Sequence, residues 1–102
     1  MALARSKKLQ ASARGQDCAL RLIGTCNGNP ETVVLCHIGK VRGMACKAGD
    51  NMTIFACSAC HDAIDGRAKY DKESNPNLAE DFLRALEETQ QIHIDNELMV
   101  IK

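Results

Sequence analysis

Two short runs of apolar and β-branched residues lie near the middle of the chain, over residues 32–38 and 52–56. Runs of this length and composition are typical of β-strands. The segment between them, residues 39–50, contains three glycines and three basic residues, and it predicts a loop. Two strands joined by such a loop predict an antiparallel hairpin.

The clearest amphipathic helix is predicted over residues 78–89. Apolar side chains recur there every three or four positions, and Asn77 directly before them can cap the helix. The tail, residues 91–101, continues this helix or turns at Asp95 and Asn96 into a small hairpin, and we favour the hairpin. His93 is expected on the surface.

The segments that flank the predicted hairpin carry weaker signals. Residues 1–16 are basic and have no clear apolar face, so we expect a short helix or a mobile arm with no part in the core. Residues 18–26 have the length of one strand or turn, and residues 27–30 are rich in turn formers. A short helix is expected to begin at or just after Cys57, with Ser58 at the N-cap position.

The composition indicates that something besides a hydrophobic core stabilises the fold. The chain has 102 residues, only two Phe, one Tyr and no Trp, and six cysteines. A single domain of this size leaves much of its surface exposed, and few large aromatic side chains are available here to fill a core. No apolar run reaches the length of a signal peptide or a membrane span, so we expect a soluble, cytoplasmic protein. In a reducing compartment, metal ligation by cysteines is favoured over disulfides.

Charge is divided unevenly along a chain whose formal net charge is zero. Residues 1–47 contain eight Lys and Arg against two Asp and Glu, whereas the remainder contains five against eleven. A basic half of this kind can face a polyanion, although it is also compatible with ordinary solvated surface. Lys40, Arg42 and Lys47 lie in the predicted loop, where they are candidates for contacts with a nucleic-acid backbone.

The cysteine spacing predicts a metal site. Residues 57–60 form a Cys-x2-Cys knuckle, a spacing at which two thiolates can reach one tetrahedral zinc ion. Cys18 and Cys26 are the natural second pair, although seven residues separate them instead of the usual two to four. A redox-active pair is the rival interpretation, but such pairs normally open a helix in a βαβ unit, which this sequence lacks. Cys36 and Cys46 can be buried as small hydrophobic residues.

Two of the three histidines lie beside cysteines. Side chains alternate across a strand, so Cys36 and His37 cannot both face one site, and one of the two must pack inward. His61 and Asp65 are four residues apart on the expected helix, so they share a face. A nitrogen and a carboxylate in this arrangement can bind one divalent cation.

The order of strand, basic loop, strand, Cys-x2-Cys-His and helix resembles the HNH or ββα-metal nucleases. More closely, residues 14–67 resemble a lambdoid-prophage nuclease family typified by YbcO. The matching positions are Arg14, Gly15, Cys18, residues 26–32, Leu35, His37, Ile38, residues 56–62, Ile64 and Asp65. The resemblance implies an α+β fold in which a small, zinc-stapled HNH-like ββα-metal core carries an additional C-terminal helix. We therefore expect one domain over residues 1–102, with a basic arm (1–16), the core (17–70) and the C-terminal helix and tail (77–102).

The resemblance also implies roles for particular residues. It implies a structural zinc ion held by four cysteines, which are Cys18, Cys26, Cys57 and Cys60. His37 is similar to the first histidine of the HNH pattern, the general base, and His61 resembles the last, a ligand of the catalytic metal. Cys36 stands where the pattern usually has an Asp that binds this metal. The middle Asn, which orients the base, is matched by Asn51 or by Asp50, and Asp50 can instead supply a carboxylate to the metal.

From these features we expect a phage or prophage endonuclease that hydrolyses DNA phosphodiester bonds. His37 would act as general base, and Mg²⁺ or Mn²⁺ would be held by His61 with Asp65 or Asp50. The alternative is a zinc-stabilised nucleic-acid-binding or adaptor domain without catalysis, which the missing Asp before His37 favours. A homodimer is compatible with either function, and the sequence identifies no interface.

Overall fold

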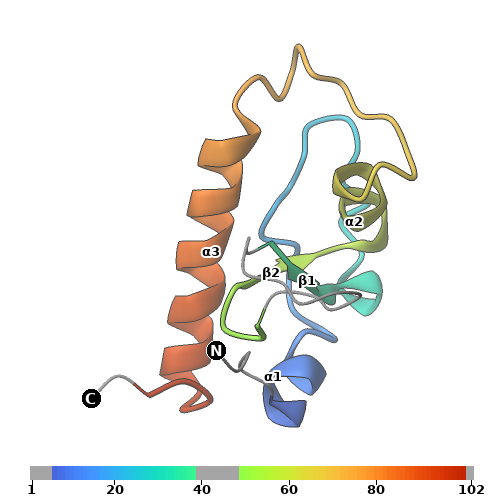
Figure 1. Cartoon of the computed structure of the whole chain (residues 1–102). Coiled ribbons are helices and arrows are strands. Elements are labelled where there is room, and N and C mark those ends of the chain that lie inside the picture. The colour runs from blue at the N-terminus through green and yellow to red at the C-terminus, as the bar shows by residue number, and fades with distance from the viewer. Residues whose placement is uncertain (1–5, 39–48, 101–102) are drawn as a thin grey trace.

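The computed structural model describes residues 6–38 and 49–100 (Figure 1). In these ranges the chain forms a small α+β fold with a two-stranded sheet and three α-helices. The elements in chain order are α1 (Lys7–Ser12), the 3-10 turn η1 (Pro30–Thr32), β1 (Val34–His37), β2 (Thr53–Ala56), α2 (Ser58–Ile64) and α3 (Leu78–Asp95). No helix in this described part of the chain is both long and apolar enough to cross a membrane.

Strands β1 and β2 form the antiparallel hairpin that the apolar runs predict, with Leu35 opposite Phe55 and His37 opposite Thr53. Every residue of β2 is buried. The outer edge of this strand is also occupied, because the Phe55 N–H donates to Thr89 Oγ1 at 3.0 Å and the Phe55 carbonyl accepts from the Ala19 N–H at 2.8 Å. These bonds satisfy buried backbone groups and attach β2 both to α3 and to the segment before the hairpin.

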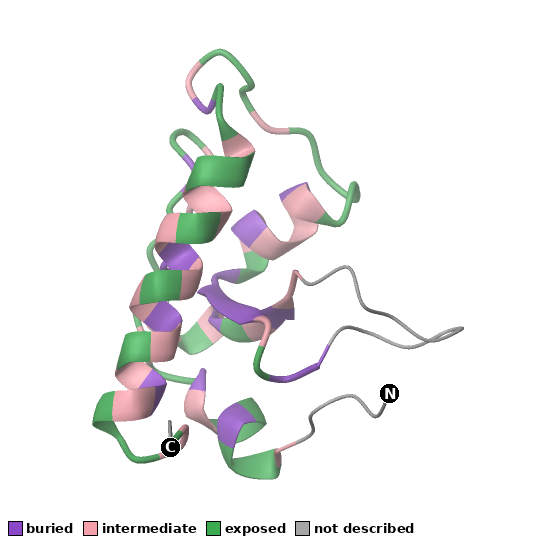
Figure 2. Ribbon diagram, turned by 60° about the vertical axis from the view of Figure 1, so that its left-hand side comes forward, coloured by how far each residue is buried: buried purple, intermediate pink, exposed green. Residues whose placement is uncertain are grey.

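Helix α3 lies along one side of the molecule, and the hairpin, α1 and α2 lie on the other (Figure 1). Its buried stripe consists of Ala85, Thr89 and His93, which are spaced four residues apart (Figure 2). Ala85 and Thr89 are small, so the helix can approach β2 closely. The Asn77 side chain accepts from the Glu80 N–H at 3.2 Å, which confirms the predicted N-cap.

The expectation that residues 1–16 take no part in the core is wrong. A short helix does form there, and its Leu9 and the following Ala13 are buried at 6% and 2% exposure. The Ser12 hydroxyl donates to the Leu9 carbonyl at 2.6 Å and lies 3.1 Å from His93 Nε2 on α3. Two apolar residues four positions apart make too short a stripe to stand out in the sequence, and only their packing reveals the role of the helix.

The predicted C-terminal hairpin is also wrong, because α3 continues through Asp95 and the described residues after it contain no strand. His93 is fully buried instead of lying on the surface. Extending the helix places His93 on the same stripe as Thr89, where its ring packs edge-on against Phe55 at 5.2 Å between centroids. The chain then folds back, and the N–H groups of Leu98 and Met99 donate to the His93 carbonyl.

Helix α2 begins where the sequence predicts, but Cys57 is its N-cap and Ser58 is its first residue. The Cys57 sulfur accepts from the Cys60 N–H at 3.4 Å and takes the place of the usual hydroxyl cap. Residues 18–26 form turns and no strand, which settles the alternative left open by the sequence.

Candidate metal centre and histidine site

Hydrogen bonds from distant residues hold the turns at residues 18–26 in place. Arg84 on α3 donates to the carbonyls of Ala19 and Leu20 at 3.0 and 2.7 Å. The Asn75 side chain accepts from the Ile23 N–H at 2.8 Å and donates to its carbonyl at 3.0 Å. A segment without regular secondary structure thereby presents its two cysteines to the start of α2.

The structure brings four cysteine sulfurs together, and each lies within 4.8 Å of the others. They belong to Cys18, Cys26, Cys57 and Cys60, the set that the sequence predicts for zinc. The Cys57 and Cys26 sulfurs are 3.8 Å apart, and these cysteines are free thiols. A tetrahedral site with Zn–S bonds of about 2.3 Å has sulfur–sulfur distances of about 3.8 Å, so the donor set fits Zn²⁺.

Backbone N–H groups point at these sulfurs. The Cys18 sulfur accepts from the N–H groups of Arg21 and Cys57 at 3.4 and 3.3 Å. Arg21 has a φ angle of 48°, a left-handed conformation that a non-glycine residue adopts only at a cost of about 1–2 kcal/mol. Such donors stabilise thiolates, which are the form that binds a metal.

Hydrogen bonding and burial shift the pKa values of three of the four thiols. The bond from Cys60 lowers the pKa of Cys18 to about 4, although burial opposes this shift. The same bond, together with burial, raises the pKa of Cys60. Burial is also the main cause that raises the pKa of Cys26. The cluster thus favours a thiolate at Cys18, held by the thiol of Cys60.

A second feature is a histidine–aspartate pair at the end of β1. His37 Nε2 lies 2.7 Å from Asp50 Oδ1, and the two side chains are 13% and 1% exposed. Since a carboxylate only accepts hydrogen bonds, Nε2 carries the proton in this contact, and in the neutral imidazole Nδ1 then has the lone pair. Cys36, on the opposite face of the strand, is buried at 2% exposure, so the thiol is the member of this pair that packs into the core.

Asp50 is held by groups on both of its oxygens. Oδ2 accepts from the Ser6 N–H at 2.7 Å and from Gln10 Nε2 at 2.9 Å. Burial raises the pKa of Asp50, but the hydrogen bonds from His37, Ser6 and Gln10 outweigh it and hold the pKa below its ordinary value. The sequence left Asp50 and Asn51 open as partners of His37. Asp50 makes the contact, whereas the side chain of Asn51 is exposed.

The two side chains that the sequence assigns to a catalytic cation lie close together, His61 on α2 and Asp65 at its C-cap. His61 Nε2 and Asp65 Oδ2 are 3.4 Å apart, and both side chains are partly exposed. In residues 6–38 and 49–100, no third His, Cys, Asp or Glu ligand atom completes a cluster with them. A Mg²⁺ or Mn²⁺ ion bound here would fill its shell with water and phosphate oxygens, as Mg²⁺ commonly does.

Other residues singled out from the sequence fall outside the described part of the chain. They are Lys40, Arg42, Cys46 and Lys47. Conversely, sequence reasoning missed Ser6 and Gln10, because no motif connects them to a residue 40 or more positions later.

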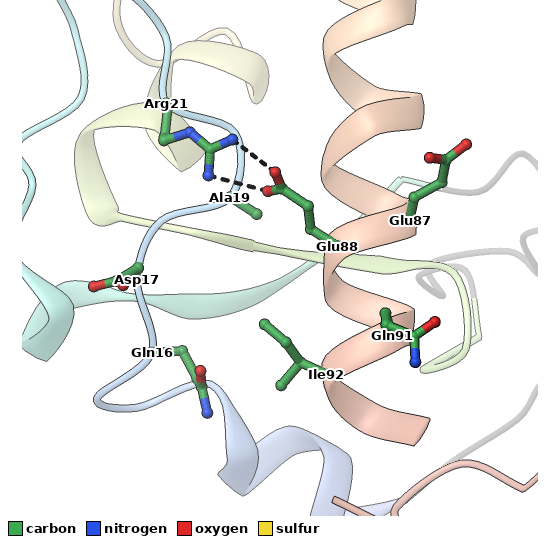
Figure 3. Close-up of a pocket in the computed structure, with 8 residues that line it drawn as sticks. All are labelled: Gln16, Asp17, Ala19, Arg21, Glu87, Glu88, Gln91 and Ile92. Atoms are coloured by element: carbon green, nitrogen blue, oxygen red, sulfur yellow. Dashed lines mark hydrogen bonds and ion pairs between the residues drawn. The ribbon is translucent and has the colours of Figure 1, made fainter. Parts of the chain in front are cut away.

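A groove of about 580 Å³ lies between residues 16–21 and α3 (Figure 3). Arg21 and Glu88 close one end with two hydrogen bonds of 3.0 and 2.8 Å. Its lining includes Asp17 and Gln91 but no histidine or cysteine. The groove is therefore separate from both the cysteine cluster and the His37–Asp50 pair.

Comparison with known proteins agrees with the resemblance. Residues 7–95 match the family model described as "Putative nuclease YbcO". Over 64 residues the chain is 48% identical to "Putative nuclease YbcO" of Escherichia coli (strain K12) and to "Putative nuclease ybcO" of Enterobacteria phage 82. Each of these matches covers 61% of this chain and 67% of the relative.

A solved structure supports the same grouping. It is described as "Structure of a putative bacteriophage protein from Escherichia coli str. K-12 substr. MG1655", and it matches 86% of this chain and 98% of its own with a TM-score of 0.67 and 39% identity. The family model spans the four clustered cysteines, His37, Asp50 and all three α-helices. The chain belongs to the family of the putative nuclease YbcO.

Proposed function

We propose that this protein is a metal-dependent endonuclease of the HNH type that hydrolyses DNA phosphodiester bonds. The observation that carries the proposal is the contact between His37 Nε2 and Asp50 Oδ1 at 2.7 Å. This contact leaves Nδ1 of a partly exposed imidazole as a base. Membership of the family of the putative nuclease YbcO and the order β1, β2, α2 support it.

In the reaction that we propose, His37 activates water. Nδ1 takes a proton from a water molecule, whose oxygen then bonds to phosphorus. The bond between phosphorus and the 3′ oxygen breaks, and that oxygen takes up a proton from solvent. Asp50 holds the imidazole in position and stabilises its protonated form. A divalent cation held by His61 and Asp65 would supply positive charge to the phosphate and to the leaving oxygen.

The four clustered cysteines have a structural role in this proposal. Zinc bound there would join the turns at residues 18–26 to the junction of β2 and α2, and so fix the helix that carries His61. Cys36, which replaces the usual Asp of the HNH pattern, is buried in the core and is left out of the catalytic ligand set that we propose. Lys40, Arg42 and Lys47 follow His37 along the chain and would contact the phosphate backbone.

The test is cleavage of an end-labelled DNA duplex by zinc-loaded protein in the presence of Mg²⁺, Mn²⁺ or a chelator of divalent cations. We expect cation-dependent products with 3′-hydroxyl and 5′-phosphate ends. His61→Ala should lose cleavage, whereas Asp62→Asn, a change at a half-exposed side chain on the same helix, should retain it. DNA binding without cleavage under every cation would contradict the proposal and favour a zinc-stabilised nucleic-acid-binding domain.

A further inference from the structure

We infer that α1 belongs to the active site and that Gln10 is a positioning residue for the His37 base. The inference rests on the proposed function for its catalytic meaning and on the contacts of Asp50 for its geometry. Three donors surround this carboxylate: His37 on Oδ1 at 2.7 Å, and the Ser6 N–H and Gln10 Nε2 on Oδ2 at 2.7 and 2.9 Å.

The three contacts fix the direction of the carboxylate. Asp50 is 1% exposed, so water has little access to replace a donor that is lost. With both donors on Oδ2, Oδ1 faces the imidazole and keeps the proton on Nε2. If the donor from Gln10 is removed, a buried oxygen loses a partner, and the carboxylate can rotate or draw closer to its remaining donors.

Helix α1 is anchored independently of Gln10. Leu9 and Ala13 pack in the interior, while Gln10 itself is exposed and reaches Asp50 only with its amide. The Ser12 hydroxyl donates to the Leu9 carbonyl, so it accepts a hydrogen bond from His93 Nε2 on α3. A change at Gln10 should therefore leave the helix docked and act mainly on Asp50.

The hydrogen bonds to Oδ2 also limit how Asp50 can bind a cation. Since two N–H donors occupy Oδ2, a cation at this oxygen would have to displace them. The contacts therefore favour Asp50 as the partner that orients His37, with His61 and Asp65 as the cation ligands of the proposed site. The proposed active site thus draws on α1, β1, residue 50 and α2, which lie far apart in the sequence.

Two substitutions separate positioning from structural support. Gln10→Ala removes the donor, and Gln10→Glu keeps the shape but replaces the donor with an acceptor. Lys8→Ala, another exposed position on α1, is the matched control. The first readout is the ¹⁵N spectrum of the His37 ring, which reports its tautomer and needs no activity. The second is steady-state cleavage of the DNA duplex.

We expect the ¹⁵N signals of the His37 ring to change in both Gln10 variants, while Lys8→Ala keeps the wild-type spectrum. Because Gln10 acts on the His37 base only through Asp50, its loss should lower kcat on the order of tenfold with little change in KM. An unchanged His37 spectrum in folded Gln10→Ala and Gln10→Glu proteins would overturn the inference, whatever happens to thermal stability.

The wild-type protein gives a further test if the variants fail to fold. The Gln10 side-chain amide and the Ser6 N–H should shift together with His37 as pH is varied, because all three bind one carboxylate. Amide signals of Gln10 and Ser6 that stay fixed while the His37 ring signals change would refute the inference. If the wild-type protein does not cleave DNA but the His37 spectrum differs between the wild type and the Gln10 variants, the positioning contact stands and the proposed function fails.

Discussion

At the scale of single residues, Asp50 is the side chain that contacts the His37 ring. Alternation along β1 predicts that Cys36 and His37 face opposite sides, and the structure confirms it with the thiol inside. The partner of His37 could not be decided from the sequence, because Asp50 and Asn51 are adjacent and differ only in the direction of their side chains. Tertiary packing decides which residue contacts His37, because it buries Asp50 and leaves Asn51 exposed.

Replacing Asp50 should therefore matter far more than replacing its neighbour. Asp50→Asn keeps the size of the side chain but removes the charge that stabilises an imidazolium, so we expect cleavage to fall by about 10²-fold or more. Asn51→Ala should stay within about twofold of wild type, since only its backbone carbonyl takes part in a described hydrogen bond, with Gln90. The cleavage rates of the two zinc-loaded variants measure this difference. An equal loss of cleavage in both variants would contradict the assignment of Asp50 as the partner of His37.

At the scale of elements, the hairpin, the start of α2 and the start of α3 could all be predicted because their signals are local. Apolar runs, a cysteine knuckle and an Asn cap each lie within a few residues. The docking of α1 and the extension of α3 could not be predicted in this way. Both bring together residues that are far apart in the sequence, such as Ser12 and His93, which are 81 residues apart.

Burial of His93 predicts that stability falls in acid. Its Nε2–H donates to Ser12, and within the described residues its buried Nδ1 has no partner. Burial lowers the pKa of His93, so below pH of about 6.5 the unfolded chain binds a proton that the folded protein binds less readily. The free energy of unfolding should then decrease as the pH is lowered, by at most about 1.4 kcal/mol per pH unit for this one proton.

Urea unfolding at several pH values between 8 and 5 measures this dependence. His93→Leu should be less stable than wild type at pH 8, because Ser12 loses a partner, yet it should show a shallower pH dependence. A pH dependence that is equally steep in both proteins would contradict the role assigned to His93.

At the scale of the whole molecule, the cysteine cluster joins two parts of the chain that lie far apart in the sequence. Cys18 and Cys26 come from turns, and Cys57 and Cys60 from the junction of β2 and α2. The composition predicts such a link, since only two Phe and one Tyr are available to a core of this size. Cysteine spacing is a chemical signal in the sequence, so the site could be identified before any packing was known.

Metal removal should destabilise the fold strongly. We expect about one zinc ion per chain, and we expect chelation to lower the thermal midpoint or abolish cooperative unfolding, because binding free energy at a structural zinc site is folding free energy. Cys26→Ala should lose zinc, whereas Cys36→Ala, a change at a buried cysteine outside the cluster, should keep it. Metal analysis with thermal unfolding measures both effects, and a zinc-free protein of unchanged stability would refute the structural role.

The most direct test of His37 as the general base is nicking of supercoiled plasmid by zinc-loaded wild-type protein and by zinc-loaded His37→Ala, each with Mg²⁺ or Mn²⁺. A general base typically contributes about 10²–10⁴-fold, so His37→Ala should lose nicking by that order while it retains zinc and DNA binding. Equal nicking by the two purified proteins would show that His37 is not the base. It would then contradict the function proposed for the His37–Asp50 pair.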